Sequence, residues 1–364
     1  MIRHKSMARV QCNAGGGWNV ELDFIKIIAC CAVICLHYST SFCGRSIFGG
    51  GSVACEMFFM ISGYLMMPSI KQENTGIDAV RFITEKLKKI YPLFFVSAII
   101  YYLLYYGINI EQNIFSAAEE VEKVFWGGIL LSEIGIGRAI GHTWYISAML
   151  IGMFILFPIL SKTAHNKYFA CVYAPVISGF IYAYLKARYG MTQADTYAMT
   201  GDAVLIVFPN LMRALAGLML GCFVYCVSEH YRINFDGCKR KRVCLKLLEF
   251  SLILVVFGGL MQKTSFSKWD FIEIFCFVVI LFIAVSCPYE IKNKRVKGIV
   301  LYLGRLSLPM YLFQFIPGYI LTILDVKGVQ NYVFRTVIFW ITLVLMSAIS
   351  MYLTRKCAMR RRKH

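Results

Sequence analysis

Long runs of apolar residues recur along the whole 364-residue chain and are separated by short polar segments. A membrane-spanning helix needs about 20 mostly apolar residues, and ten runs approach or exceed this length. They cover residues 21–40, 53–70, 90–107, 142–161, 169–186, 203–227, 247–262, 270–287, 298–321 and 333–354. The runs are continuously apolar and do not alternate, which favours helices over a barrel. We therefore expect an all-α polytopic membrane protein of about ten transmembrane helices.

The composition supports this interpretation and excludes several other classes. Hydrophobic residues make up 59% of the chain and charged residues only 16%, whereas about a quarter of the residues of a soluble protein are charged. The 14 cysteines are scattered, mostly within apolar runs, and none has the spacing of a metal-ligand pair. We therefore expect no metal site. The net charge is +18, and the basic residues lie in short loops between apolar runs. Because this leaves no basic soluble face to bind nucleic acid, we expect no nucleic-acid partner.

The basic residues instead predict how the chain is oriented in the membrane, because cytoplasmic loops carry an excess of Lys and Arg. With the N-terminus in the cytoplasm, 26 of the 38 Lys and Arg residues lie inside and 9 lie outside, including Lys186 and Arg335 at the ends of their runs, and the other three are Lys26, Arg213 and Arg305. We expect both termini to be cytoplasmic. The predicted organisation is an N-terminal cytoplasmic segment (1–20), a transmembrane domain (21–354) and a basic cytoplasmic tail (355–364).

One long connection, from about 108 to 141, faces outward in this topology. Its segment SAAEEVEKVFWGGILL combines acidic residues with Val121, Phe125, Trp126 and Leu130, a pattern typical of an amphipathic helix at the membrane surface. A purely structural lid is the alternative interpretation.

Ionisable residues within the first run are the strongest candidates for chemistry, because such groups are costly at membrane depth. Lys26 and His37 are 11 residues apart, which places them on one stripe of a helix, about 16 Å apart along its axis. Asp23 is three residues before Lys26 and can pair with it. The alternative is that Lys26 extends to the inner headgroups and that His37 only caps the outer interface.

Five segments in order resemble the acyltransferase 3 family of integral-membrane acyltransferases. They are LDFIKIIACCAVICLH, CEMFFMISGYLM, RFITEKLKKIYP, GHTWYISAMLIGMFILFP and LGRLSLPMYLFQ, and they extend from about residue 20 to 320. Members of this family carry a basic residue, usually arginine, ten intervening positions before a histidine in the first helix. Lys26 and His37 occupy these two positions.

The resemblance implies transfer of an acyl group, commonly acetyl from acetyl-CoA, to a hydroxyl of a cell-surface carbohydrate or a glycolipid precursor. No cofactor would be permanently bound, and the protein would be a multi-pass component of a membrane, most simply the bacterial plasma membrane, in contact with its lipids. His37 is the expected general base, because imidazole titrates at about pH 6.5. A covalent acyl-histidine intermediate remains an alternative.

Cations near the cytoplasmic end are candidates for binding the donor's phosphates. They are Lys26, Arg81, Lys86, Lys88 and Lys89, of which the resemblance favours Lys86 and Lys89. For the loop cations, the residues alone favour the alternative of ordinary positive-inside bias.

Glu56, at an acidic position of the family, is expected in the catalytic group with His37 and Lys26. It would either orient the imidazole or form a buried ion pair with Arg213 or Arg305. Ser62 and Gly63 are expected to allow close helix packing, with hydrogen bonding of a substrate by Ser62 as the alternative.

The acceptor side is expected at the outer end of the fourth run. Its candidates are His142, Trp144 and Tyr145, whose aromatic rings stack on sugars or belong to the interfacial belt. Polar groups at membrane depth should face the interior, and the candidates to line a central cavity are Asn210, Arg213, Arg305, Ser307 and Tyr311.

Two positions depart from the family pattern. Lys26 replaces the usual arginine, which keeps the charge and loses the bidentate fork. Gln314 stands where many members have a histidine, so any titrating role is lost there and only hydrogen bonding survives. A transporter or flippase, in which Lys26, His37 and Glu56 would form a proton relay or substrate site, is the alternative function.

Overall fold

The first apolar run forms one helix, α1 (Val20–Phe42), in the computed structural model of the chain. This helix begins where it does because the side-chain oxygen of Asn19 accepts hydrogen bonds from the backbone N–H groups of Glu21 and Leu22. The amide of Asn19 also donates to the carbonyl of Ala284 at 2.9 Å. The capping residue thus fixes the start of α1 against α11 (Trp269–Ser286).

The structure describes residues 19–44, 47–72, 76–108, 141–162, 168–189, 203–230, 239–261, 269–289, 291–326 and 332–360. These residues form helices and connecting turns without a strand. The remaining elements are η2 (Gly49–Val53), α2 (Ala54–Gln72), α3 (Gly76–Ile108), η4 (Gly141–Thr143), α5 (Trp144–Lys162), η5 (Phe169–Tyr173), α7 (Ala174–Tyr189), α9 (Ala203–His230), α10 (Lys239–Leu260), α12 (Lys294–Phe313), α13 (Ile316–Val326) and α14 (Tyr332–Arg360).

The described helices confirm the all-α polytopic architecture. Nine of them are long and apolar enough to cross a membrane, and they correspond to nine of the ten predicted runs. The tenth run is α1, which is helical over its full predicted length and carries Glu21, Asp23 and Lys26. The predicted surface helix in the connection between about 108 and 141, SAAEEVEKVFWGGILL, lies outside the described residues.

One predicted span is wrong as a single helix. Residues 298–321 divide into α12 and α13, which are separated by a turn at Gln314 and Phe315. Pro317, which has no backbone N–H and restricts the residue before it, explains the break, because helices usually end before such a position. With 11 residues, α13 is too short to span a bilayer.

Helix α9 is central to one half of the bundle and packs against α2, α5 and α7. The α2–α9 contact is close because a Cβ atom at Gly63 would overlap the carbonyl oxygen of Leu218. This confirms the expectation that Gly63 permits tight helix packing.

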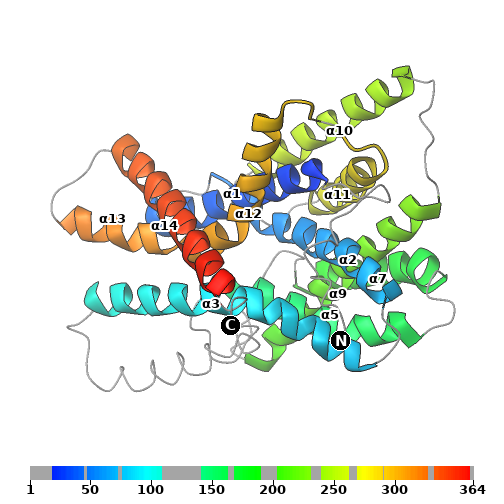
Figure 1. Cartoon of the computed structure of the whole chain (residues 1–364), viewed down its shortest axis with the longest axis horizontal. Coiled ribbons are helices and arrows are strands. Elements are labelled where there is room, and N and C mark those ends of the chain that lie inside the picture. The colour runs from blue at the N-terminus through cyan, green and yellow to red at the C-terminus, as the bar shows by residue number, and fades with distance from the viewer. Residues whose placement is uncertain are drawn as a thin grey trace.

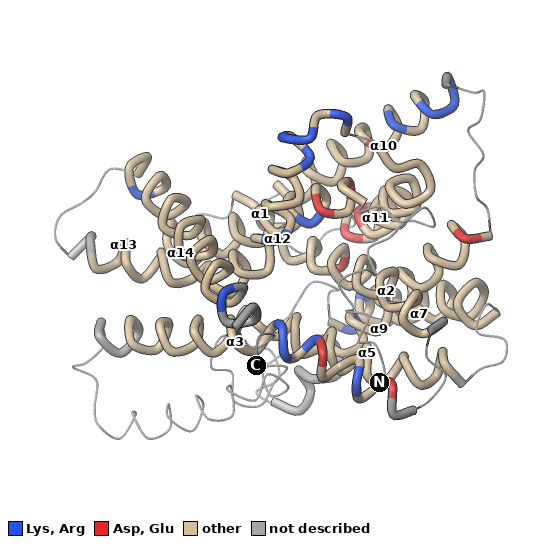
Figure 2. The backbone as a smooth tube through the Cα atoms, in the orientation of Figure 1, with Lys and Arg blue, Asp and Glu red and all other residues tan. Residues whose placement is uncertain are grey.

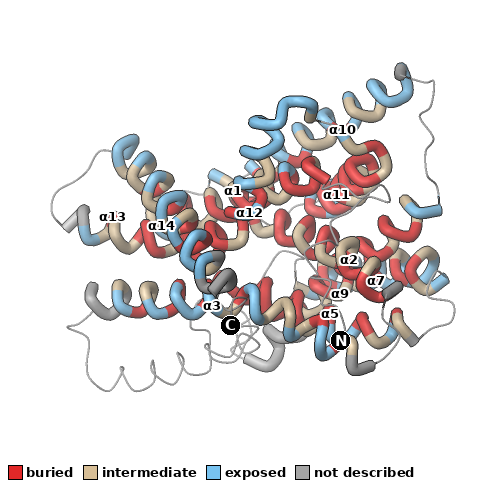
Figure 3. The backbone as a smooth tube through the Cα atoms, viewed as in Figure 1, coloured by how far each residue is buried: buried red, intermediate tan, exposed pale blue. Residues whose placement is uncertain are grey.

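Helix α1 is central to the other half, where it packs against α12 and touches α13, and α12 in turn contacts α14. Figure 1 shows α1 running through the middle of the molecule. Burial follows the same plan, since α1, α2 and α11 are largely buried, whereas α10 and α14 expose much of their length (Figure 3). The two exposed helices have apolar outer faces that suit contact with lipid.

Candidate active site

The continuous helix α1 places Lys26 and His37 on one stripe. Eleven residues correspond to about 16 Å along the axis and three turns plus about 20°. Nζ of Lys26 lies 3.1 Å from Oδ1 of Asp23, which confirms the predicted pairing. The stripe therefore has a paired cation at one end and an imidazole at the other.

Helix α12 lies directly against this stripe. A Cβ at Gly304 would collide with the side chain of Asp23, so the absence of a side chain at Gly304 allows the two helices to approach. Three residues further along α12, the carbonyl of Ser307 accepts a hydrogen bond from the thiol of Cys30 at 3.2 Å. Since α12 follows α1 toward His37, the end of α12 reaches the imidazole.

Two imidazoles meet at that end. The ring centroids of His37 and His142 are 6.3 Å apart, and Phe315 contacts both, at 5.1 Å from His37 and 4.6 Å from His142. His37 is half-buried, whereas His142 is buried. His37 is thus the more accessible imidazole of the pair.

His142 is held by α12 through both its side chain and its backbone. Its Nε2 lies 3.3 Å from the carbonyl oxygen of Leu312, so a neutral imidazole that donates there carries its proton on Nε2 and an acceptor lone pair on Nδ1. The hydroxyl of Tyr311 donates to the carbonyl of His142. Gln314 is buried and donates from Nε2 to the carbonyl of Tyr311 at 2.9 Å, a hydrogen-bonding role that requires no histidine.

Other acceptor-side candidates continue from His142. The ring of Tyr311 lies 5.7 Å from that of Tyr145. The hydroxyls of Tyr145 and Ser62 both contact the sulfur of Met149, at 3.3 and 3.1 Å. Four candidates that the sequence placed in three different runs, namely Ser62, His142, Tyr145 and Tyr311, are therefore neighbours.

Lys86 and Lys89 are the candidate donor cations that group with Lys26. The positive charges of Lys26 and Lys89 both act on the ammonium group of Lys86, whose Nζ lies 5.0 Å from the centroid of the Phe82 ring. Lys86 is half-buried, whereas Arg81 and Lys89 are exposed. Lys88 is an exposed residue that pairs with Glu85 at 2.8 Å.

Glu56 pairs with Arg213, one of the alternatives that the sequence left open. Both side chains are almost completely buried, and Nε of Arg213 lies 2.7 Å from Oε1 of Glu56. Tyr182 donates to the other carboxylate oxygen at 2.6 Å, and Arg213 also donates to the carbonyl of Ser52. The carboxylate is thus bound by α9 and α7, and the contacts found for it do not include His37.

Trp144 joins this ion pair to the imidazoles. The guanidinium of Arg213 lies 4.8 Å from its ring centroid, a cation–π geometry. The next residue, Tyr145, contacts Tyr311, and Tyr311 contacts His142. The first turn of α5 therefore contacts both the ion pair and the aromatic residues around the imidazoles.

Arg305 does not face the interior, contrary to prediction, because it is exposed on α12. Its neighbour Gly304 packs on Asp23, and successive helix residues turn by about 100°, so the Arg305 side chain points away from α1. Asn210 and Ser307 are buried as expected.

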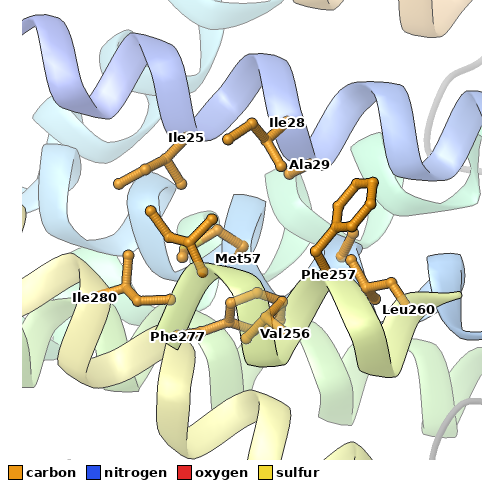
Figure 4. A pocket seen from close by; sticks show the side chains of 11 residues that line it. Ile25, Ile28, Ala29, Met57, Val256, Phe257, Leu260, Phe277 and Ile280 are labelled. Carbon is orange, nitrogen blue, oxygen red and sulfur yellow. The ribbon is translucent and has the colours of Figure 1, made fainter. Parts of the chain in front are cut away.

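A cavity on a different face of α1 is entirely apolar. Figure 4 shows Ile25, Ile28 and Ala29 of α1 facing side chains of α10 and α11 across it. The full lining consists of Ile25, Ile28, Ala29, Ala54, Met57, Ile253, Val256, Phe257, Leu260, Phe277 and Ile280. With no ionisable lining residue, it offers nothing to acid–base chemistry, and the polar stripe is the better candidate site.

Two residues near the candidate site were not singled out from the sequence. Phe315 contacts both imidazoles because α12 ends just before it, and Pro317 is the sequence signal for that end. Tyr182 binds Glu56 from α7, and nothing in its apolar surroundings signals this contact.

Comparisons with known proteins agree with the resemblance. The acyltransferase-domain model of the acyltransferase 3 family matches residues 19–355. Searches of curated proteins and of solved structures gave no match. Because the family model covers nearly the whole chain, this multi-pass membrane protein belongs to the acyltransferase 3 family and is a membrane acyltransferase.

Proposed function

We propose that the protein transfers an acetyl group from acetyl-CoA to a hydroxyl of a cell-surface glycan or glycolipid precursor. The observation that carries the proposal is the stripe on α1, with cations grouped around Lys26 at one end and the half-buried imidazole of His37 at the other. Acetyl-CoA is arranged in the same order along its length, with its phosphates at one end and its thioester at the other. The long pantetheine arm between them suits the separation of about 16 Å along the helix.

The donor would bind with its phosphates at Lys26, Lys86 and Lys89. Lysines bind phosphate as point charges. The positive-inside count predicts that this end of α1 is cytoplasmic, on the side where acetyl-CoA is made. The thioester would then lie beside His37, toward the outer side of the membrane.

His37 acts as the general base in this proposal. As the acceptor oxygen forms its bond to the acetyl carbon, the hydroxyl proton moves to the imidazole. The bond between that carbon and sulfur breaks, and coenzyme A leaves as a thiolate that takes up the proton from His37. A short-lived acyl-histidine would use the same imidazole as nucleophile.

The acceptor would enter from the side of His142, Tyr145 and Tyr311. Their aromatic rings offer stacking surfaces for a sugar, and the lone pair of His142 offers a hydrogen-bond acceptor. Such a site would hold the acceptor hydroxyl between the two imidazoles.

The test is transfer of labelled acetyl from acetyl-CoA to surface glycan by membranes that contain the protein or its His37→Ala variant. General-base catalysis contributes about 10²–10⁴-fold, so we expect the variant to lose at least about a hundredfold in rate at equal membrane abundance. Cys35→Ala is the matched control, since Cys35 is half-buried on the opposite side of α1 and should retain activity.

Equal incorporation by the parent and the His37→Ala variant would show that His37 is structural. If the parent transfers no label while the glycan changes in another way, the result would favour the transporter or flippase alternative.

A further inference from the structure

A second group of cations lies away from the candidate active site, where α10 begins and where the chain enters α12. Figure 2 shows Lys and Arg gathered on both segments. Between them is an open recess whose lining combines two basic residues and an amide with apolar side chains. It is lined by Arg242, Tyr289, Ile291, Lys292, Asn293 and Val296.

Several contacts organise this recess. The guanidinium of Arg242 donates to the carbonyl of Pro288 at 2.8 Å, which ties α10 to the segment before α12. Asn293 caps α12 by accepting from the N–H groups of Arg295 and Val296, and its amide NH₂ is a further donor. Among the described residues that line the recess, none is acidic, and Glu290 lies outside the described residues.

The end of α12 adds to the positive potential. The N-terminus of a helix carries a partial positive charge, and Lys292 stands just before it. The recess thus combines two full positive charges and an amide donor, which favour a phosphate, and the partial positive charge of the capped helix end adds to their attraction.

The surfaces beside the recess are apolar and exposed. Val243 and Leu247 of α10 are 57% and 61% exposed, and Val296 and Ile299 of α12 are 45% and 59% exposed. Both helices are long and apolar enough to cross a membrane. The recess therefore lies where the lipid-facing surface of two spanning helices meets the headgroup layer.

We propose that this recess binds the phosphate headgroup of an anionic phospholipid, whose acyl chains lie on the exposed faces of α10 and α12. A soluble phosphate shares the headgroup chemistry, but only a lipid also covers the adjoining apolar surface. Basic pockets between spanning helices are suited to such headgroups. The proposal does not depend on acyl transfer, because it is tested by binding.

The experiment measures lipid retention by native mass spectrometry on the full-length protein in detergent, with phosphatidylglycerol and phosphatidylcholine of identical chains. We expect the parent to retain phosphatidylglycerol preferentially. The double variant Arg242→Gln/Lys292→Gln should lose about thirtyfold in apparent affinity for it, and Lys292→Gln alone should lose about fivefold. Arg240→Gln, which removes an exposed charge from the same helix, should change the affinity by less than about twofold.

Three outcomes would overturn the proposal. Equal retention of the two lipids by the parent would show that the recess does not select an anionic headgroup. A loss in Arg240→Gln as large as in the double variant would show only diffuse attraction by surface charge. Displacement of the lipid by millimolar inorganic phosphate or coenzyme A, lost in the double variant, would assign the recess to a soluble phosphate compound.

Discussion

At the scale of single residues, the role proposed for Lys86 in donor binding can be tested through the KM for acetyl-CoA. Its half-buried ammonium lies over the Phe82 ring and within the fields of Lys26 and Lys89. In Lys86→Gln we expect the KM for acetyl-CoA to rise about tenfold with little change in kcat, because a charge-assisted contact to a phosphate would be lost equally from ground and transition states.

Lys88→Gln is the control for that measurement, since Lys88 is exposed and paired with Glu85. Its KM should stay within about twofold of the parent. An unchanged KM in Lys86→Gln would remove Lys86 from the donor site, whereas a fall in kcat alone would place its effect on the chemical step.

The sequence predicted individual polar positions better than it predicted their partners. Helical periodicity placed Lys26 and His37 on one stripe because both belong to one helix. The pairing of Glu56 with Arg213, and not Arg305, depends on α9 packing against α2, and periodicity within one helix carries no such information. The contact between His37 and His142 joins residues 105 positions apart and arises in the same way.

At the scale of elements, the α2–α9 contact depends on Gly63. Its replacement by alanine would place Cβ against the Leu218 carbonyl, which is backbone and cannot move aside as a side chain can. We expect Gly63→Ala to lower the free energy of unfolding by about 1–3 kcal/mol, seen as a lower unfolding midpoint in detergent.

Gly179→Ala is its control within α7, because no heavy atom lies within 4 Å of a Cβ built there. Alanine favours helix over glycine, so this variant should unfold at the parent's midpoint or slightly above. Equal destabilisation by both substitutions would show that the close contact at Gly63 does not limit stability.

The sequence predicted the elements well because lipid requires long apolar helices and leaves few alternatives. Where it was wrong, at residues 298–321, hydropathy continued smoothly through a break that Pro317 causes. Hydropathy measures whether a segment tolerates lipid, whereas a proline changes backbone hydrogen bonding at a single position. The orientation of Arg305 was misjudged because the close contact at Gly304 sets which face of α12 meets α1.

At the scale of the whole molecule, the distribution of Lys and Arg predicts sidedness. Cys244, exposed near the start of α10, should be cytoplasmic, and Cys43, half-buried at the end of α1, should face outward. A membrane-impermeant maleimide added to intact cells should therefore modify Cys43 and spare Cys244, as read by peptide mass spectrometry.

Inside-out vesicles provide the control, because the pattern should reverse in them. Modification of Cys244 in intact cells would show that the orientation is the reverse of the predicted one. The donor end of α1 would then face away from cytoplasmic acetyl-CoA.

The buried pair of Glu56 and Arg213 has a consequence for how inactive variants are interpreted. It binds Tyr182 of α7 and stacks on Trp144 of α5, so four helices, α2, α5, α7 and α9, meet at one ion pair that Trp144, Tyr145 and Tyr311 connect to His142. Removing one partner leaves a charge stranded in the interior. We expect such a variant to lose the arrangement of its candidate active site while it keeps His37 and Lys26, so that its defect would imitate the loss of a catalytic acid.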